Sequence, residues 1–89
     1  MATATSRERS FGRQAGVASA PRYRRRLGEN IRAQRKQLGL RQERLAEKAE
    51  LHPVYVGRVE RGEENVSIDS LMRIAKALKI SLQELVNGF

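Results

Sequence analysis

Apolar residues recur with helical spacing along the chain from residue 21 onward. Tyr23, Leu27, Ile31 and Leu38 follow one another at steps of four, four and seven residues, which places them on one face of a helix. Gly39 comes next, at the place where a left-handed residue ends many helices. The pattern therefore predicts a first helix over about 22–38.

The second and third predicted helices, over about 42–49 and 53–61, are separated by only three residues. His52 is expected at the N-cap of the third helix, and Pro53 suits its first position because proline has no N–H to satisfy. Gly62 ends this helix. Two helices joined by so short a turn form a helix-turn-helix candidate. The small side chain of Ala46 allows them to cross closely.

Two further helices complete the pattern. Ser67 is expected at the N-cap of the fourth helix, whose apolar face holds Leu71, Ile74, Ala75 and Leu78. Ser81 and Glu84 have the spacing of a capping box at the start of a fifth helix. No segment alternates with period two, so no sheet is expected. The sequence predicts an all-α, five-helix domain over residues 21–89.

Residues 1–20 differ in composition from this domain. They mix Ala, Ser, Thr, Gly and Arg without an apolar period, and such a stretch buries too little surface to offset its ordering entropy. The whole chain has a net charge of +8, and residues 1–26 hold seven arginines against one glutamate. A disordered basic arm is therefore expected. Its charge favours a polyanionic partner, nucleic acid ahead of a membrane surface, and the alternative is a tail that only aids solubility.

The composition argues against several classes of protein. The chain has no cysteine and a single histidine, so neither a disulfide framework nor a metal site is expected. No apolar run approaches the roughly 20 residues of a membrane span, and no export signal is evident, so a cytoplasmic location is expected. The chain shows no paired carboxylates, Ser/His/Asp set or Gly-rich phosphate loop. We therefore expect no enzyme activity, no cofactor and no small-molecule substrate.

The helix-turn-helix candidate lies within a longer run of characteristic motifs. These are RQERLA, then LHPVYVGRVERG, then a fourth helix ending in IAKAL. The stretch LGLRQERLAEKAELHPVYVGRVERGEENVSIDSLMRIAKALKISLQELV resembles the lambda-repressor-like, or Xre-type, helix-turn-helix family, and the resemblance extends over about Tyr23 to Asn87. The tract LHPVYVGRVERGEENVS is similar to stand-alone regulators, including the controllers of restriction–modification systems. The resemblance implies a transcriptional regulator whose partner is double-stranded DNA.

Three positions depart from the family's usual pattern. Glu50 stands where the family has glycine in the turn, which implies modest strain if its φ is positive. Arg41 replaces the Thr or Ser that caps the second helix, and such a cap contributes about 0.5–2 kcal/mol. Glu64 replaces a basic residue in the loop after the third helix, which removes one expected phosphate contact.

The outward face of the third helix is expected to enter the major groove. Base contacts are predicted for Pro53, Val54, Gly57 and Arg58. The forked guanidinium of Arg58 matches guanine O6 and N7, and Gly57 permits a close approach of the backbone. Pro53 and Val54 are placed to meet thymine methyl groups. The alternative is an ordinary solvated helix face.

Phosphate contacts are predicted around this face, for Arg41, Gln42, Tyr55, Arg61 and Asn65. Gln42 resembles the glutamine with which the family clamps a phosphate, at a helix N-terminus where unpaired N–H groups favour an anion. Arg41 and Asn65 lie on flanking segments, and the Tyr55 hydroxyl is a further donor. The alternative is that these are surface polar residues, with Tyr55 a packing residue.

Two charged residues fall on apolar helix faces. Arg35 follows Ile31 by four residues, and Glu60 follows Val56 by four. Either charge buried alone would be strongly unfavourable, so a bidentate ion pair between them is expected. The family pairs an arginine and a glutamate at the matching places. The alternative is that Arg35 extends to water.

The C-terminal end is expected to form a homodimer interface, with Leu82, Leu85, Val86 and Phe89 in contact with a second copy. The alternative is that these residues close the core of the monomer. The predicted function is sequence-specific binding of a palindromic operator by a homodimer, with the third helix in the major groove. Two alternatives stay open: a protein-interaction or antitoxin-type adaptor domain, and a non-specific nucleic-acid binder.

Overall fold

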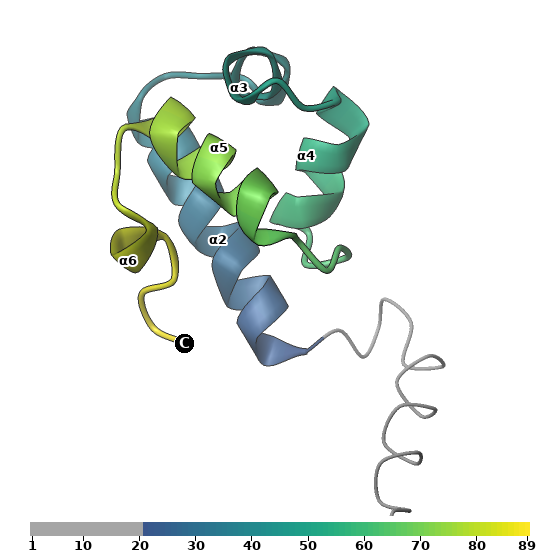
Figure 1. Cartoon of the computed structure of the whole chain (residues 1–89), viewed down its shortest axis with the longest axis vertical. Coiled ribbons are helices and arrows are strands. Elements are labelled where there is room, and N and C mark those ends of the chain that lie inside the picture. The colour runs from purple at the N-terminus through teal and green to yellow at the C-terminus, as the bar shows by residue number, and fades with distance from the viewer. Residues whose placement is uncertain (1–20) are drawn as a thin grey trace, which may run out of the picture.

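The computed structural model of the chain describes residues 21–89, and the predicted arm of residues 1–20 lies outside this range. Five helices joined by short connections surround one apolar core (Figure 1). They are α2 (Arg22–Gln37), α3 (Gln42–Ala49), α4 (Pro53–Glu60), α5 (Ile68–Leu78) and α6 (Leu82–Leu85). The described part of the chain holds no strand, and the all-α, five-helix prediction is confirmed.

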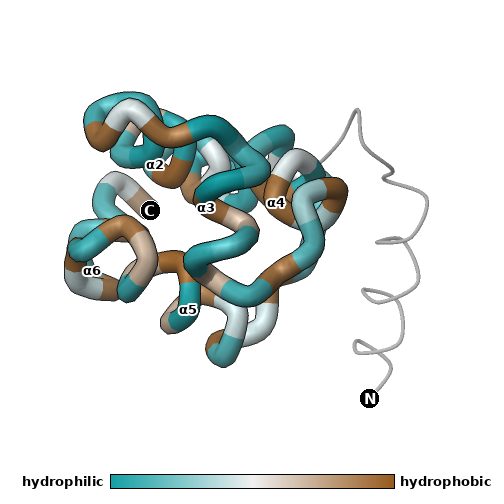
Figure 2. Tube along the Cα trace, turned by 90° about the horizontal axis from the view of Figure 1, so that it is seen from above, coloured by the Kyte–Doolittle hydropathy of each residue, from teal (hydrophilic) through white to brown (hydrophobic). Residues whose placement is uncertain are grey.

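The helices pack around α2 and α5. In Figure 1, α5 lies in front of α2, with α3 above them, α4 on one side and α6 on the other. Figure 2 shows hydrophobic and hydrophilic stretches alternating along the helices, as amphipathic helices around one core require. The largest side chains that are almost completely buried come from every helix, and they are Ile31, Leu45, Val56, Val59, Ile74, Leu78 and Leu85.

Four helices end in the same way. Gly39, Glu50, Gly62 and Lys79 adopt positive φ angles of 71°, 59°, 78° and 61° after α2, α3, α4 and α5 respectively. After each, the next N–H donates back across the last turn, for example Leu51 N to Ala46 O at 2.9 Å and Glu63 N to Arg58 O at 2.9 Å. This closure satisfies carbonyls at the helix end and turns the chain sharply. It explains how such short connections are possible.

The predicted N-caps are present. The backbone N–H of Val54 donates to His52 Nδ1 at 3.1 Å at the start of α4, and that of Ser70 donates to Ser67 Oγ at 3.1 Å at the start of α5. Ser81 and Glu84 form the expected capping box. Arg41 at the start of α3 makes no side-chain cap hydrogen bond, as its departure from Thr or Ser implies.

Two residues of the predicted apolar face of α2 are not in the core. Tyr23 is 50% exposed and Leu38 is 45% exposed, so their assignment to the buried face is corrected. The helix is longer than the elements that cover it. The buried stripe therefore holds Leu27, Ile31 and the charged Arg35.

Gly28 lies where α2 packs against the end of α4. A Cβ atom at this position would lie 2.6 Å from the Glu60 carbonyl carbon and 2.7 Å from the Val59 carbonyl oxygen. Both are backbone atoms that a side-chain rotation cannot move. A residue without a Cβ therefore permits this close contact, which fixes the end of α4 against α2.

The C-terminal segment is attached to α2. Asn30 Nδ2 donates to the carbonyl oxygens of Leu85 at 2.9 Å and Asn87 at 2.8 Å. The rings of Tyr23 and Phe89 lie with centroids 6.2 Å apart, within the range of aromatic pairing. The C-terminus accordingly lies beside α2 in both views (Figures 1 and 2).

Candidate nucleic-acid interface

The α3–turn–α4 unit has the predicted helix-turn-helix geometry. Residues 50–52 form the turn, and Glu50 adopts the left-handed conformation with φ 59° and ψ 45° where the family has glycine. Ala46 is 1% exposed, and Leu51 packs against the core from the turn. Two helices are thus held at a fixed crossing, with α4 at the surface.

One face of α4 is available to a partner. Val56 and Val59 are buried, whereas Val54 is 58% exposed and the side chain of Arg58 is 54% exposed. Pro53 is exposed as well. A hollow of about 370 Å³ lies beside this face and is lined by His52, Val54, Tyr55, Arg58 and Glu64. Pro53 and Val54 lie in the first turn of the helix, the part that reads bases in proteins of this architecture, and Arg58 lies on its last turn.

Gly57 differs from its prediction as a base contact. It is buried, because the side chains of Gln42 and Arg61 cover it at distances of 3.5 Å and 3.3 Å from the position of a Cβ atom. Gly57 is therefore covered on the side where a Cβ atom would lie, and its placement on the open face is corrected.

Three helices meet in one polar network. Arg35 Nε donates to Glu60 Oε2 at 2.6 Å and Arg35 Nη2 donates to Glu60 Oε1 at 3.0 Å, which is the bidentate geometry expected from the sequence. The side chains are 10% and 3% exposed. Gln42 Nε2 donates to Glu60 Oε1 at 2.9 Å, and Arg35 Nη1 donates to the Leu40 carbonyl at 2.9 Å. Glu60 therefore connects α2, α3 and α4.

This network fixes Gln42 at the N-terminus of α3. An amide group carries two N–H donors, and Glu60 accepts from the group at 2.9 Å. The other donor is available to a phosphate. Arg41 and Asn65 are exposed on the flanking segments, and Tyr55 is half-buried against the core. The predicted phosphate contacts other than Arg61 thus lie on the N-terminus of α3, on α4 and on the loop that follows it.

In the loop after α4, two glutamates pair with two arginines of that helix end. The sequence did not predict these pairs. Arg61 Nε and Nη2 donate to Glu63 at 2.9 Å and 3.2 Å, and Arg58 Nη1 donates to Glu64 Oε2 at 3.3 Å. The hydrogen bond from Arg61 lowers the pKa of Glu63, and the same bond raises the pKa of Arg61. Only the sharp turn at Gly62 brings these acids back beside the helix.

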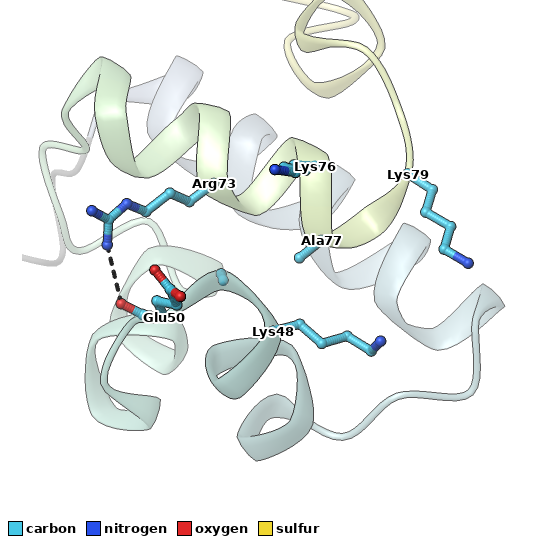
Figure 3. Close-up of a pocket in the computed structure, with 7 residues that line it drawn as sticks. Lys48, Glu50, Arg73, Lys76, Ala77 and Lys79 are labelled. Atoms are coloured by element: carbon cyan, nitrogen blue, oxygen red, sulfur yellow. Dashed lines mark hydrogen bonds between the residues drawn. The ribbon is translucent and has the colours of Figure 1, made fainter.

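A second, basic hollow lies between the C-terminal ends of α3 and α5, with a volume of about 360 Å³. Its lining includes Lys48, Arg73, Lys76 and Lys79, and Figure 3 shows Arg73 reaching the Glu50 carbonyl, to which it donates at 3.3 Å. Lys48 and Lys76 lie in the last turns of their helices, where cations interact favourably with the helix dipole. Two of the four basic residues of this hollow are thus placed favourably at helix ends.

The C-terminal apolar residues divide into two groups. Leu85 has no exposed surface, so its prediction as a contact with a second copy is corrected: it belongs to the core of the domain. Leu82 and Val86 are half-buried, and Phe89 is 57% exposed beside Tyr23. Leu82 also lines an apolar groove of about 420 Å³ between α5 and α6, together with Met72 and Ile80.

Within residues 21–89, no helix combines the length and the hydrophobicity needed to cross a bilayer. The same residues contain no group of three or more His, Cys, Asp or Glu side chains arranged to hold a metal ion.

A short helix-turn-helix is typical of DNA-binding regulators when its second helix is exposed and a glutamine is held at the start of the first. Here that glutamine is Gln42, which donates to Glu60. The chain belongs to the helix-turn-helix family, whose model matches residues 31–85. The family is of the Xre type, as the resemblance implies. The chain is thus a DNA-binding transcriptional regulator.

Several individual proteins of known description are similar to this chain. The control protein C.SmaI of Serratia marcescens is 47% identical over 60 residues, which cover 67% of this chain and 71% of the relative. The solved structure of the restriction–modification controller protein C.AhdI from Aeromonas hydrophila has 43% identity and a TM-score of 0.68, covering 68% of this chain and 92% of that one. The clp gene regulator ClgR from C. glutamicum has 32% identity and a TM-score of 0.69, covering 73% and 84%.

Proposed function

We propose that this protein is a control protein of a restriction–modification system, which binds a palindromic operator as a homodimer. The similarity to both relatives supports the kind of regulator, because C.AhdI is described as a restriction–modification controller protein, C.SmaI as a control protein, and both are more than 40% identical to the chain. The exposed face of α4 supports sequence-specific binding. The proposal places the chain in the cytoplasm, assigns it no catalytic activity and includes no small-molecule substrate.

The observation that carries the proposal is the position of Arg58. Its side chain is 54% exposed on α4, and it emerges beside the hollow that Val54 and Tyr55 line. An arginine in this position reaches guanine O6 and N7 in the major groove. The backbone at the N-terminus of α3 and the free donor of Gln42 bind the flanking phosphates. Base and phosphate contacts are thus divided between the two helices.

Selection of bound sites from random duplex DNA tests this division. The protein is expected to select a palindrome, and Arg58→Ala is expected to lose about 1–3 kcal/mol of preference at one base-pair position in each half-site. Gln42→Ala, the control for a phosphate contact, is expected to weaken binding to all sequences nearly equally. Titration by fluorescence anisotropy at several salt concentrations measures both effects. A steep salt dependence without any selected sequence would indicate a non-specific nucleic-acid binder. If the protein bound no DNA at all, it would be a protein-interaction adaptor.

The groove between α5 and α6 is the proposed site of dimerisation. Met72 is 51% exposed there, beside the half-buried Ile80 and Leu82. Met72 comes from α5, Ile80 from the connection and Leu82 from α6, and an isologous contact would bury them against the same residues of a second copy. One recognition helix reads only a few base pairs, so two related by a two-fold axis and about 34 Å apart give the specificity that a genome requires.

A single charge in the groove tests the dimer. Met72→Lys is expected to convert the dimer to a monomer in sedimentation velocity at micromolar concentration, because the ammonium group would be buried without a partner. Ile68→Lys is the matched control: Ile68 is 64% exposed on the same helix but does not line the groove. It is expected to remain dimeric. If the parent protein is monomeric both free and on a palindromic duplex, the dimer proposal is wrong.

A further inference from the structure

The two arginines at the end of α4 are held by their acidic partners in different ways. Arg61 uses Nε and Nη2 together, at 2.9 Å and 3.2 Å from the Glu63 carboxylate. Arg58 uses Nη1 alone, at 3.3 Å from Glu64 Oε2. Among the described residues, Nε and Nη2 of Arg58 have no hydrogen-bond partner. One guanidinium thus has its Nε–Nη2 edge occupied, and the other has the same edge open.

The Nε–Nη2 edge is one of the two edges of a guanidinium that can read guanine. Two parallel N–H donors of a guanidinium match the O6 and N7 acceptors of guanine, and one contact on the remaining nitrogen does not interfere with them. The Glu64 contact is therefore compatible with a guanine contact by the same side chain. The Glu63 contact occupies the Nε–Nη2 edge of Arg61 and places a carboxylate beside its guanidinium.

The side chains of Glu63 and Glu64 are less exposed than those of the arginines with which they pair. The side chains of Glu63 and Glu64 are 21% and 26% exposed, against 58% for Arg61 and 54% for Arg58. Gly62, with φ 78°, and the hydrogen bond from Glu63 N to the Arg58 carbonyl fix the loop against the last turn of α4. Arg61 also lowers the pKa of Glu63 through its hydrogen bond, so this carboxylate stays charged at neutral pH.

We propose that Glu64 is a specificity-determining positioning residue, which holds Arg58 with its Nε–Nη2 edge toward the bases and away from the DNA backbone. The inference rests on the proposed function, because it assigns the orientation of the side chain that reads the operator. A guanine contact leaves the Arg58–Glu64 pair intact. A phosphate is an anion whereas guanine is neutral, so the carboxylate of Glu64 beside the Arg58 guanidinium disfavours a contact with phosphate more than a contact with guanine. Glu64 therefore weakens non-specific binding more than operator binding.

The expected size follows from the exposure of the pair. An ion pair at a surface changes an equilibrium by up to about fivefold. Glu64→Gln is therefore expected to lower the ratio of operator affinity to random-duplex affinity by about twofold to fivefold. It is also expected to broaden the base preference at the position read by Arg58. The free energy of unfolding is expected to stay nearly unchanged, because the pair is exposed.

Two control variants distinguish the positioning of Arg58 by Glu64 from the effect of one negative charge on DNA binding. Glu43 is exposed in the first turn of α3, and its side chain has no hydrogen bond or ion pair within residues 21–89. Glu43→Gln removes the same charge and is expected to change the affinities for both duplexes equally, leaving their ratio unaltered. In the Arg58→Ala background, Glu64→Gln is expected to have no further effect on base preference.

The experiment compares the chain and these variants on the selected operator and on a random duplex of equal length, by anisotropy titration at fixed salt. A Glu64→Gln protein that keeps the parent's affinity ratio and base preference would overturn the inference while leaving the proposed function intact. The same holds if the effect persists without Arg58. A parent protein that selects no sequence overturns the proposed function, and the inference with it.

Discussion

Glu60→Ala is expected to lower the free energy of unfolding by about 3–5 kcal/mol, the range for loss of one partner of a buried ion pair. The carboxylate of Glu60 is 3% exposed and accepts two hydrogen bonds from Arg35 and one from Gln42. Its removal leaves the guanidinium of Arg35 buried, with the Leu40 carbonyl as its remaining partner. Urea unfolding monitored by circular dichroism measures the change.

A domain of this size has a stability of only about 5–10 kcal/mol, so Glu60→Gln is a useful second variant. The amide keeps one acceptor oxygen, and an intermediate loss is expected. Glu47→Ala is the matched control, because Glu47 pairs with Arg44 at 2.7 Å but is 70% exposed. Its loss is expected to stay below about 1 kcal/mol. A loss of that small size for Glu60→Ala would contradict a structural role for the buried pair.

Gly28→Ala is expected to destabilise the protein by about 3 kcal/mol, the upper end of the usual range for overpacking. The new methyl group would overlap the carbonyl groups of Val59 and Glu60, so α2 and α4 must separate. The gain in helix propensity, about 1 kcal/mol, does not offset this. Separation of the helices would also move Glu60 away from Arg35.

Gly57→Ala is the control, because Gly57 is also helical but its Cβ would meet only side-chain atoms of Arg61 and Gln42, at 3.3 Å and 3.5 Å. Stability is expected to rise by up to about 1 kcal/mol. Thermal unfolding of both variants gives the comparison. Equal effects of the two substitutions would show that the close contact of α2 with α4 does not restrict position 28.

Local features of this protein follow from its sequence more directly than contacts between distant residues do. The helices, their caps at His52, Ser67 and Ser81 and the left-handed ends at Gly39 and Gly62 depend on residues within one or two turns. A periodic pattern and a capping residue are therefore enough to predict them. The pair of Arg35 and Glu60 was also predictable, because each is a charge at a position that its helix must bury.

Exposure at the ends of elements was less predictable. Tyr23 and Leu38 fit the apolar period of α2 yet lie at the surface, because periodicity gives the face of a helix but not how far its neighbours extend. Leu85 shows the opposite error. Its apolar side chain was expected to contact a second copy, but the C-terminal segment packs against α2 and encloses it.

The sequence by itself determined the fold class, the helix-turn-helix and the face of α4 that carries Arg58, because these follow from local period, capping and motif. Apart from the pair of Arg35 and Glu60, only the tertiary structure decided which polar groups meet. Gln42 donates to Glu60, Asn30 donates to the C-terminal carbonyls, and Glu63 and Glu64 approach the arginines of α4. Each of these contacts depends on a helix crossing or a sharp turn that brings separate groups within about 3 Å, and hydrogen bonds form only at such distances.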